Sequence, residues 1–415
     1  MTFTLIPPQV AASDPADLLD ADFYAFQNLL TDAEQRAVAD IRAFLDAEVR
    51  PHADDLWERA ESLRHLVPRI AELGLYANGF AETRHFDNSA VFRGWVAMEL
   101  SRADPSIATF IGVHSGLAMT SIAVGGSDEQ KAEWLPVLAS GQAVAAFGLT
   151  EPGHGSDTAR GLETTAERRG DHWVLNGAKR WIGNGAFADL VVIWARDLSD
   201  DQVKGFLVRT PAAGFAATKI ERKQSLRGVE NADIVLEDVV VAESDRLQRI
   251  DGFRDLAVVL RLTRADVAWQ GLGVGVGAYE AALAYAKART QFGKPIASFQ
   301  LVQEKLAVAL SNITASIALS VRVSQMQDEG IQADHHSAMA KAFVSARMRE
   351  TVALCREICG GNGIQLGGQS QVGIPAGYGV ARYFADAEAV FTFEGTYDMN
   401  SLIVGRAITG LSAFV

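Results

Sequence analysis

The chain has 415 residues, and its 38 basic and 51 acidic side chains give a formal net charge of −13 at neutral pH. A chain of this length exceeds one compact core, so we expect two or three domains packed together. It contains no block of like charge and no basic face, which makes nucleic acid and anionic membranes unexpected partners.

The two cysteines, Cys355 and Cys359, lie four residues apart in a helical pattern without nearby histidines. We expect reduced helix residues there, and neither a metal site nor a disulfide framework. The N-terminus has no basic segment followed by an apolar run, and we expect no membrane-spanning segment. These features are typical of a soluble, cytoplasmic protein.

The first third of the chain has helical periodicity. Residues 1–22 are rich in proline and aspartate and are expected to form a loosely held arm. The segment Thr31–Glu34 has the pattern of a capping box, and the helix that it begins is expected to stop at Pro51. Residues 23–145 are therefore predicted to form an N-terminal α-helical domain. Further helical stretches in it cover residues 67–73, 92–102, 109–124 and 128–138.

Residues 146–252 change to short apolar runs separated by Gly, Asn, Asp and Pro. Asn176 and Gly177 are expected to turn the chain after one such run. Because no long helical stretch lies between the runs, crossover helices are not expected, and the pattern favours an antiparallel β-barrel or sandwich. The runs cover residues 143–149, 172–175, 190–195, 203–208, 216–220, 234–236 and 239–241.

Residues 253–415 return to long, alanine-rich helical patterns with short connections, which predict a helical bundle. A wide apolar stripe on residues 306–321 is also typical of subunit contacts. The whole chain is thus an α+β protein of three parts. The expected helices cover residues 256–289, 299–329, 333–359 and 400–408, and a Gly-rich loop lies between residues 366 and 379.

Glu394 is a candidate general base. It lies between the aromatic residues Phe391, Phe393 and Tyr397 and is followed by Gly395. Aromatic neighbours lower the local polarity, and desolvation raises the pKa of a carboxylate toward the working pH that proton abstraction favours.

A second interpretation of this segment stays open. Thr396 or Asp398 begins a helix that runs through Arg406, and Glu394 then lies merely close to the N-cap.

Four glycines at residues 271, 273, 275 and 277 imitate a dinucleotide-binding fingerprint. That fingerprint must follow a strand and begin a helix, whereas these glycines lie inside a helical pattern. The context favours close packing of one helix against another.

Three further segments carry polar or aromatic groups next to glycine. Residues 147–157 offer the Thr150 and Ser156 hydroxyls and backbone amides that can bind a planar polar ring or a phosphate. Such a turn is also common as plain structure, and His154 in it is either a base or a solvated loop residue. Residues 179–185 place Trp181 beside glycine, as a ligand contact or as a core residue. Residues 289–293 end a helix with Arg289 and an exposed-looking Phe292, which suits a diphosphate or a helix C-cap.

Taken together and in this order, FGLTEPGHGSD, KRWIGNG, RTQFG, CGGNG and FEGTYD resemble the successive motifs of the acyl-CoA dehydrogenase and oxidase family. The resemblance runs from about Phe23 to the C-terminus. It implies an N-terminal α-helical domain, a middle antiparallel β-barrel and a C-terminal four-helix bundle. It also implies FAD as cofactor, an acyl-CoA substrate, and a homotetramer or homodimer that binds FAD between its subunits.

The resemblance assigns roles to individual residues. Glu394 is expected to take the α-proton of the acyl-CoA while hydride passes to flavin N5. Some relatives carry the base at the position of Thr263, so Glu394 is the sole candidate here. Residues expected to contact FAD are Phe147, Leu149, Thr150, Ser156, Trp181, Ile182, Gly183, Asn184, Thr396 and Asp398. Residues expected to reach the FAD of a neighbouring subunit are Arg289, Phe292, Gln300, Glu357, Gly360 and Gly361. Residues expected to contact substrate are Ala108, Thr109, Ser156, Arg264 and Gly395.

One departure from the family bears on the substrate. Within the family the chain resembles glutaryl-CoA dehydrogenases and plant short-chain acyl-CoA oxidases. Glutaryl enzymes hold the distal carboxylate with an arginine, and this chain has Ala108 there, followed by Thr109. An unpaired buried carboxylate is costly, so we expect a neutral acyl chain and no decarboxylation.

A second departure bears on the electron acceptor. Gly183 replaces a threonine that is usual in dehydrogenases, and plant oxidases share this feature. The expected activity is dehydrogenation of a short or medium uncharged acyl-CoA to the trans-2-enoyl-CoA in fatty acid metabolism, with an electron-transfer flavoprotein as acceptor. An oxidase using O2 is the alternative, and a catalytically silent scaffold is a further one.

A loop at residues 367–378, longer than in the relatives, is expected to reshape the acyl pocket or a subunit contact.

Overall fold

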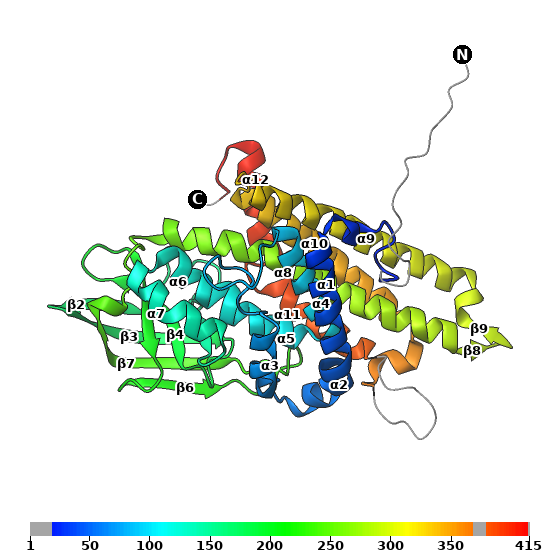
Figure 1. Cartoon of the computed structure of the whole chain (residues 1–415), viewed down its shortest axis with the longest axis horizontal. Coiled ribbons are helices and arrows are strands. Elements are labelled where there is room, and N and C mark those ends of the chain that lie inside the picture. The colour runs from blue at the N-terminus through cyan, green and yellow to red at the C-terminus, as the bar shows by residue number, and fades with distance from the viewer. Residues whose placement is uncertain (1–18, 368–378, 414–415) are drawn as a thin grey trace, which may run out of the picture.

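The computed structural model describes residues 19–367 and 379–413. Helices, then strands, then helices follow one another along the chain, as the change of periodicity predicts (Figure 1). Most of the expected arm at residues 1–22 and of the expected loop at residues 367–378 lies outside the described residues.

The N-terminal helices begin where the capping pattern predicts. The Thr31 amide donates to Glu34 Oε2 over 2.8 Å, which completes the capping box. Pro51, however, does not end a helix, so that prediction was wrong. Proline lies in the first turn of a new helix, where its missing N–H has no partner to lose, and a π-helical segment Leu45–Val49 joins the two helices. The helices of this part are α1 Asp32–Phe44, α2 Arg50–Arg59, α3 Val67–Glu72, α4 Ala90–Ala103, α5 Pro105–Ile111, α6 Thr120–Gly125 and α7 Asp128–Ala139.

Two segments are long and apolar enough to cross a membrane by length and composition, Pro105–Gly125 and Gln300–Asp328, each with mean hydropathy 1.6. The expectation that the chain has no membrane-spanning segment stays a prediction. The first contains no Asp, Glu, Lys or Arg, and 50% of its most apolar window is buried within the protein. For the second the buried share is 44%. Core helices pass the same test of length and composition.

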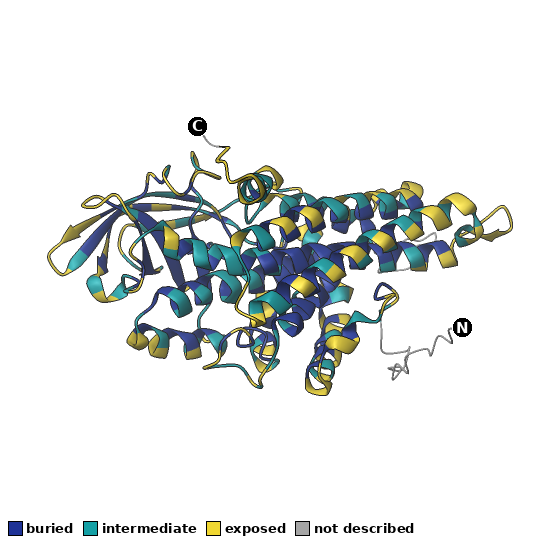
Figure 2. Ribbon diagram, turned by 90° about the horizontal axis from the view of Figure 1, so that it is seen from above, coloured by how far each residue is buried: buried dark blue, intermediate teal, exposed yellow. Residues whose placement is uncertain are grey.

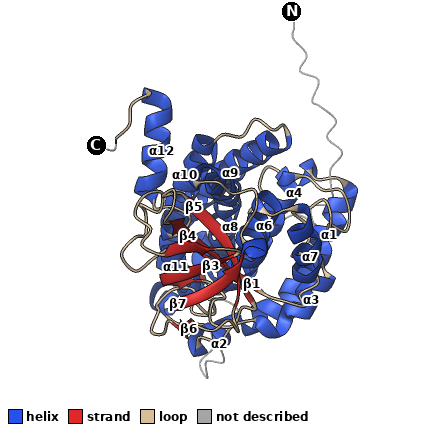
Figure 3. Ribbon diagram, turned by 90° about the vertical axis from the view of Figure 1, so that its left-hand side faces the viewer, coloured by secondary structure: helices blue, strands red, loops and turns tan. Residues whose placement is uncertain are grey.

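The middle part is a seven-stranded curled sheet (Figure 3). Most neighbours are antiparallel, as predicted, but β1 and β2 both pair with β4 in parallel. Because β2 and β3 intervene between β1 and β4, the chain has length enough to return in the same direction. In the described pairings β1, β5 and β6 each have only one neighbour, so the sheet is mixed and open. The strands are β1 Ala145–Gly148, β2 Thr165–Arg169, β3 His172–Ile182, β4 Leu190–Asp197, β5 Val203–Arg209, β6 Phe215–Lys219 and β7 Ala232–Ala242.

The prediction of a turn at Asn176 and Gly177 was wrong, since β3 runs through both residues. Its register against β7 shifts between Leu175 and Gly177, which marks a bulge. Gly177 has φ 148°, and a Cβ there would lie 2.6 Å from Thr164 Cα, so glycine is required by close approach. The chain instead reverses at Gly170, between β2 and β3.

The C-terminal part is built on three long helices that lie side by side, α8, α9 and α10 (Figure 1). A short hairpin of Thr290–Gln291 and Lys294–Pro295 joins the first two helices. Helix α11 was not expected from the sequence, although Val380, Tyr383, Ala387 and Val390 have helical spacing and are buried. The helices are α8 Phe253–Ala288, α9 Gln300–Asp328, α10 Asp334–Ile358, α11 Val380–Thr392 and α12 Tyr397–Thr409.

The glycines inside α8 permit close helix packing, as their context predicts. An added Cβ at Gly273 would collide with the Met98 carbonyl oxygen, and one at Gly277 would lie 2.6 Å from the Arg102 carbonyl oxygen. Helices α4 and α8 thus approach backbone to backbone. Figure 2 shows that buried residues gather where the N-terminal helices meet the bundle.

His114 ties the N-terminal helices to the sheet. Its Nε2 lies 3.0 Å from the Leu138 carbonyl oxygen, and its Nδ1 accepts from the Ala145 amide over 2.9 Å. This pair of contacts requires the neutral ring with its hydrogen on Nε2. Burial lowers the pKa of His114 from 6.5 to about 4, because the charged ring would be desolvated and would oppose the Ala145 N–H.

The free energy of unfolding should therefore depend on pH through His114. Between about pH 6.5 and pH 4 the unfolded chain binds a proton that the folded chain does not, so stability falls as the pH falls, by up to about 3 kcal/mol. Urea unfolding at several pH values measures this. In His114→Gln the amide can make both contacts without titrating, and this component of the pH dependence should vanish. An unchanged dependence would assign it to other groups.

Candidate active site

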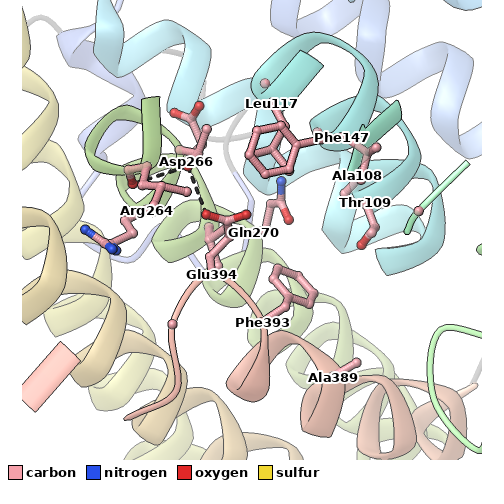
Figure 4. A pocket seen from close by; sticks show the side chains of 18 of the residues that line it. Ala108, Thr109, Leu117, Phe147, Arg264, Asp266, Gln270, Ala389, Phe393 and Glu394 are labelled. Carbon is pink, nitrogen blue, oxygen red and sulfur yellow. Dashed lines mark hydrogen bonds between the residues drawn. The ribbon is translucent and has the colours of Figure 1, made fainter. Parts of the chain in front are cut away.

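A cavity of about 920 Å³ lies where the three parts of the chain meet. The end of β3, the loop after β1, the helices around residue 110, α8 and the segment before α12 all contribute to it (Figure 4). Most of the predicted site residues are brought together here. Those that line the cavity are Ala108, Thr109, Phe147, Leu149, Thr150, Ser156, Trp181, Ile182, Gly183, Arg264, Glu394, Gly395 and Thr396.

Glu394 lies in a strained turn between α11 and α12. Its φ is 54°, in the left-handed region that costs a non-glycine residue about 1 kcal/mol, and Gly395 follows with φ 85°. The buried Lys341 amine holds the turn, donating to the Phe391 carbonyl over 2.7 Å and to the Gly395 carbonyl over 2.8 Å. Asn400 Nδ2 is a second donor to the Gly395 carbonyl, over 2.8 Å. The turn is thus imposed by buried polar contacts.

The Glu394 carboxylate points into the cavity and accepts a hydrogen bond from the Thr263 hydroxyl over 2.9 Å (Figure 4, dashed line). Burial raises the pKa of Glu394, while the Thr263 hydrogen bond and the charges of Arg264 and Lys341 lower it. A carboxylate that is desolvated and oriented in this way has the properties of a general base.

The polar residues around Glu394 carry their own constraints. The Arg264 Nε is buried without a hydrogen-bond partner among the described residues. Burial lowers the pKa of Lys341 to about 8, and Glu394 opposes that shift. The charge of Glu394 and the charges of Arg264 and Lys341 therefore stabilise each other in a poorly solvated space.

Both interpretations of the segment around Glu394 describe part of it. Thr396 is the N-cap of α12, and its hydroxyl accepts from the Met399 amide over 3.2 Å. Phe391 stacks on Tyr397 with ring centroids 5.8 Å apart. The cap positions the turn, and the turn directs the carboxylate.

Another part of the cavity wall fits a large polar ring system. Trp181 has φ 64° and is 51% exposed, so it is not a core residue. The hydroxyls of Thr150 and Ser156 line the cavity and have no hydrogen-bond partner among residues 19–367 and 379–413. These open donors and the exposed indole suit an isoalloxazine with its ribityl chain.

Asn184 does not line this cavity. Its side chain is buried, and Nδ2 donates to the Phe110 carbonyl over 3.1 Å. His154 lies in the loop after β1 with Nδ1 2.7 Å from Asp157 Oδ2, also outside the cavity wall. Asp398 is exposed on α12.

The six residues expected to reach a neighbouring subunit's FAD lie apart from Glu394. The hairpin that carries Phe292 is at the end of the molecule away from the sheet (Figure 1), and Phe292 is 93% exposed. Glu357 pairs with Lys305 over 3.1 Å. A role toward a second subunit stays a prediction. The residues of this group are Arg289, Phe292, Gln300, Glu357, Gly360 and Gly361.

Sequence analysis missed two polar residues of α8 that line the cavity, Asp266 and Gln270. Burial raises the pKa of Asp266 to about 6, while Arg93 lowers it and Glu394 raises it further. The available signal was spacing: the two residues lie three and seven positions after Thr263 on the same face of a helix.

No group of three or more His, Cys, Asp or Glu with metal-binding geometry occurs in the described part of the chain. Cys355 and Cys359 are both buried and free.

Replacing Lys341 tests how the turn is held. Lys341→Met removes one hydrogen bond from each of the Phe391 and Gly395 carbonyls. Asn400 still donates to the Gly395 carbonyl, so the Phe391 carbonyl alone loses its side-chain donor and the free energy of unfolding should fall by about 1–2 kcal/mol. Urea unfolding measures the change. Lys287→Met, at an exposed position, is the matched control and should change stability by less than about 0.5 kcal/mol. Equal effects of the two changes would contradict the assignment.

Three family models match successive parts of the chain: the N-terminal domain of acyl-CoA dehydrogenases at residues 31–142, the middle domain at 146–239 and the C-terminal domain at 251–409. Together they cover most of the chain.

The chain is similar to solved structures over nearly its full length. Glutaryl-CoA dehydrogenase from Mycobacterium smegmatis is 35% identical with a TM-score of 0.89, covering 96% of this chain and 100% of that one. A second structure of a glutaryl-CoA dehydrogenase from that organism, 34% identical, is in complex with FADH2. Butyryl-CoA dehydrogenase from Megasphaera elsdenii is 28% identical with a TM-score of 0.84, covering 91% and 98%.

Among curated proteins, the 3-(aryl)acrylate reductase of Clostridium sporogenes is 31% identical over 370 residues, which is 88% of this chain and 95% of the relative. The family matches and the cavity described above agree on the cofactor and the class of reaction. The chain belongs to the acyl-CoA dehydrogenase family and is an FAD-dependent oxidoreductase that acts on the CH–CH bond of an acyl-CoA.

Proposed function

We propose that this enzyme converts a short or medium uncharged acyl-CoA to the trans-2-enoyl-CoA, with Glu394 as the base. The observation that carries the proposal is the Glu394 carboxylate itself, which faces the cavity from a strained turn and is oriented by the Thr263 hydroxyl at 2.9 Å. No other carboxylate among the described residues combines this orientation with two neighbouring cations, Arg264 and Lys341.

The protein's own residues serve to remove the α-proton of the substrate. Glu394 takes the α-proton of the thioester, and its raised pKa makes the carboxylate a stronger acceptor near neutral pH. Loss of the proton places negative charge on the thioester oxygen. The Glu394 backbone N–H can donate a hydrogen bond to that oxygen, because it has no acceptor among the described residues. FAD, when bound, accepts the β-hydride, so one proton and one hydride leave the substrate.

Apart from Arg264 beside Glu394, the cations that line the described part of the cavity wall already have partners in the protein. Ala108 is buried, and the Thr109 hydroxyl donates to the Pro105 carbonyl over 2.8 Å. The Lys223 amine lines the cavity but donates to Leu226, Val229 and Asn231 oxygens at 2.6 to 2.7 Å.

The remaining cation on this side, Arg93, is also compensated. It donates to the Asn88 side chain over 3.0 Å, lies 3.9 Å from Asp328 and interacts with Asp266. A dicarboxylic acyl group would thus meet cations that already have partners, at a cost of several kcal/mol. This supports a neutral acyl chain, although glutaryl-CoA dehydrogenases are among the similar structures.

The electron acceptor belongs to the same proposal. Electron-transfer flavoproteins are known partners in this family, and we propose one here. The alternative, O2, is favoured by Gly183. A side chain there would lie 2.8 Å from Val113 Cγ2, so the packing at this point is adapted to glycine.

We further propose a homo-oligomer, a tetramer or a dimer. Met339 and Phe343, one turn apart on α10, are 46% and 38% exposed and form part of an apolar face. A cytoplasmic location and a role in fatty acid metabolism complete the proposal.

Replacing the base gives the direct test. Glu394→Gln keeps the shape of the side chain but cannot accept the proton, so flavin reduction by substrate should fall by at least about 10³-fold while FAD remains bound. Stopped-flow absorbance of the flavin measures the rate. Glu388→Gln is the control, because that carboxylate on α11 pairs with Arg349 at 2.8 Å. Undiminished reduction by the Glu394 variant would remove the proposed base.

The substrate and the acceptor are tested together. FAD-loaded protein is mixed without air with butyryl-, isobutyryl-, octanoyl- and glutaryl-CoA, and bleaching of the flavin is expected with at least one neutral thioester. Bleaching by glutaryl-CoA alone would overturn the argument from Ala108. No bleaching by any of them would favour a silent scaffold.

Air is then admitted to the reduced protein. Slow recovery of the yellow flavin is expected if the acceptor is an electron-transfer flavoprotein. Fast recovery with formation of peroxide would identify an oxidase instead.

A further inference from the structure

One wall of the cavity carries a polar pair that the proposed chemistry does not use. Asp266 and Gln270 lie one turn apart on α8, on the same face as Thr263, which contacts the base. Neither side chain has a hydrogen-bond partner among residues 19–367 and 379–413. The rest of this wall is mostly apolar, so the pair is a local polar site within the acyl pocket.

Gln270 is the stronger indication of a ligand. The residue is only 6% exposed, yet its amide makes no hydrogen bond within the described chain. Its amide is therefore directed to the cavity and not sealed in the core, and it is available to a polar group of the substrate.

Gly112 leaves the space that the Gln270 amide occupies. A Cβ at residue 112 would lie 2.8 Å from Gln270 Nε2. Gly112 follows Ala108 by one helical turn, so the amide reaches the wall where glutaryl enzymes are expected to carry their arginine. In Figure 4 the amide lies between Glu394 and Thr109.

The distance from the base places Gln270 beside the far part of the acyl chain, whereas Asp266 lies only about one turn from Thr263. Seven residues of α8 separate Gln270 from Thr263, a rise of about 10 Å. Helical side chains lean toward the N-terminus, which brings the amide back toward Glu394 by a few ångströms. The polar group that it receives therefore lies several bonds beyond the α-carbon.

We infer that the acyl group of the substrate carries a hydroxyl near its far end, which binds Gln270 with Asp266 as a second acceptor. This inference rests on the proposed function and names its substrate class. A hydroxyl is complementary because it both donates to an oxygen and accepts from the amide N–H. A distal carboxylate would face Asp266 and Glu394, and an alkyl end would leave the amide unpaired.

The test compares matched thioesters on the FAD-loaded enzyme. Butyryl-, hexanoyl- and octanoyl-CoA are paired with their ω-hydroxy analogues, and kcat/KM is measured from the reduction of an artificial electron acceptor. For at least one length the hydroxylated member should be favoured by about tenfold or more, because a site built for a hydroxyl discriminates against the analogue that lacks it. No preference at any length, or a preference for the 6-aminohexanoyl thioester over its hydroxy counterpart, would overturn the inference.

Gln270→Met preserves the length of the side chain and should reduce the ratio of the two kcat/KM values, hydroxylated over plain thioester, to about one. Gln224→Met, at an exposed position on the cavity rim, is the matched control and should retain the preference. Retention of the preference in Gln270→Met would also overturn the inference. If Gln270→Met does not fold, the comparison of plain and ω-hydroxy thioesters on the wild-type enzyme still tests the inference.

Failure of this inference is distinct from failure of the proposed function. Bleaching by the plain thioesters without any hydroxyl preference upholds the proposed reaction and rejects the polar site alone. No bleaching by any thioester rejects both.

Discussion

The close approach of α4 and α8 is the contact on which the rest of the structure depends. At Gly273 and Gly277 the backbone of α8 lies against the Met98 and Arg102 carbonyl oxygens, with no room for a side chain. Helix α8 provides one wall of the cavity, and the segment that follows α4 provides another. The separation of these two helices is therefore fixed by contact between their backbones.

The site itself depends on polar groups held in a poorly solvated space. Lys341 and Asn400 impose a left-handed turn on Glu394, and the Thr263 hydroxyl orients its carboxylate. The same burial that raises the carboxylate pKa makes each of these contacts costly to lose. Burial is thus the common cause of the basicity of the Glu394 carboxylate and of its fixed position.

The polar residues that line the cavity fall into two groups, according to whether their side chains already form hydrogen bonds within the protein. Thr109 and Lys223 line the cavity, but each has its donors occupied by the protein. Thr150, Ser156 and Gln270 line it with open polar groups. The first class shapes the pocket, and the second is available to cofactor and substrate.

The sequence by itself determined the order of helical, strand and helical parts, the capping box at Thr31, and the acidic and aromatic segment around Glu394, because periodicity and turn chemistry are local. The placement of Pro51 and the bulge at Gly177 depend on neighbouring elements, so local rules gave the wrong result there. Only the tertiary structure identified Gln270 as an open amide. That property depends on the space left by Gly112 and on the absence of a partner for the amide within the described part of the chain, and contacts between residues far apart in the sequence decide both.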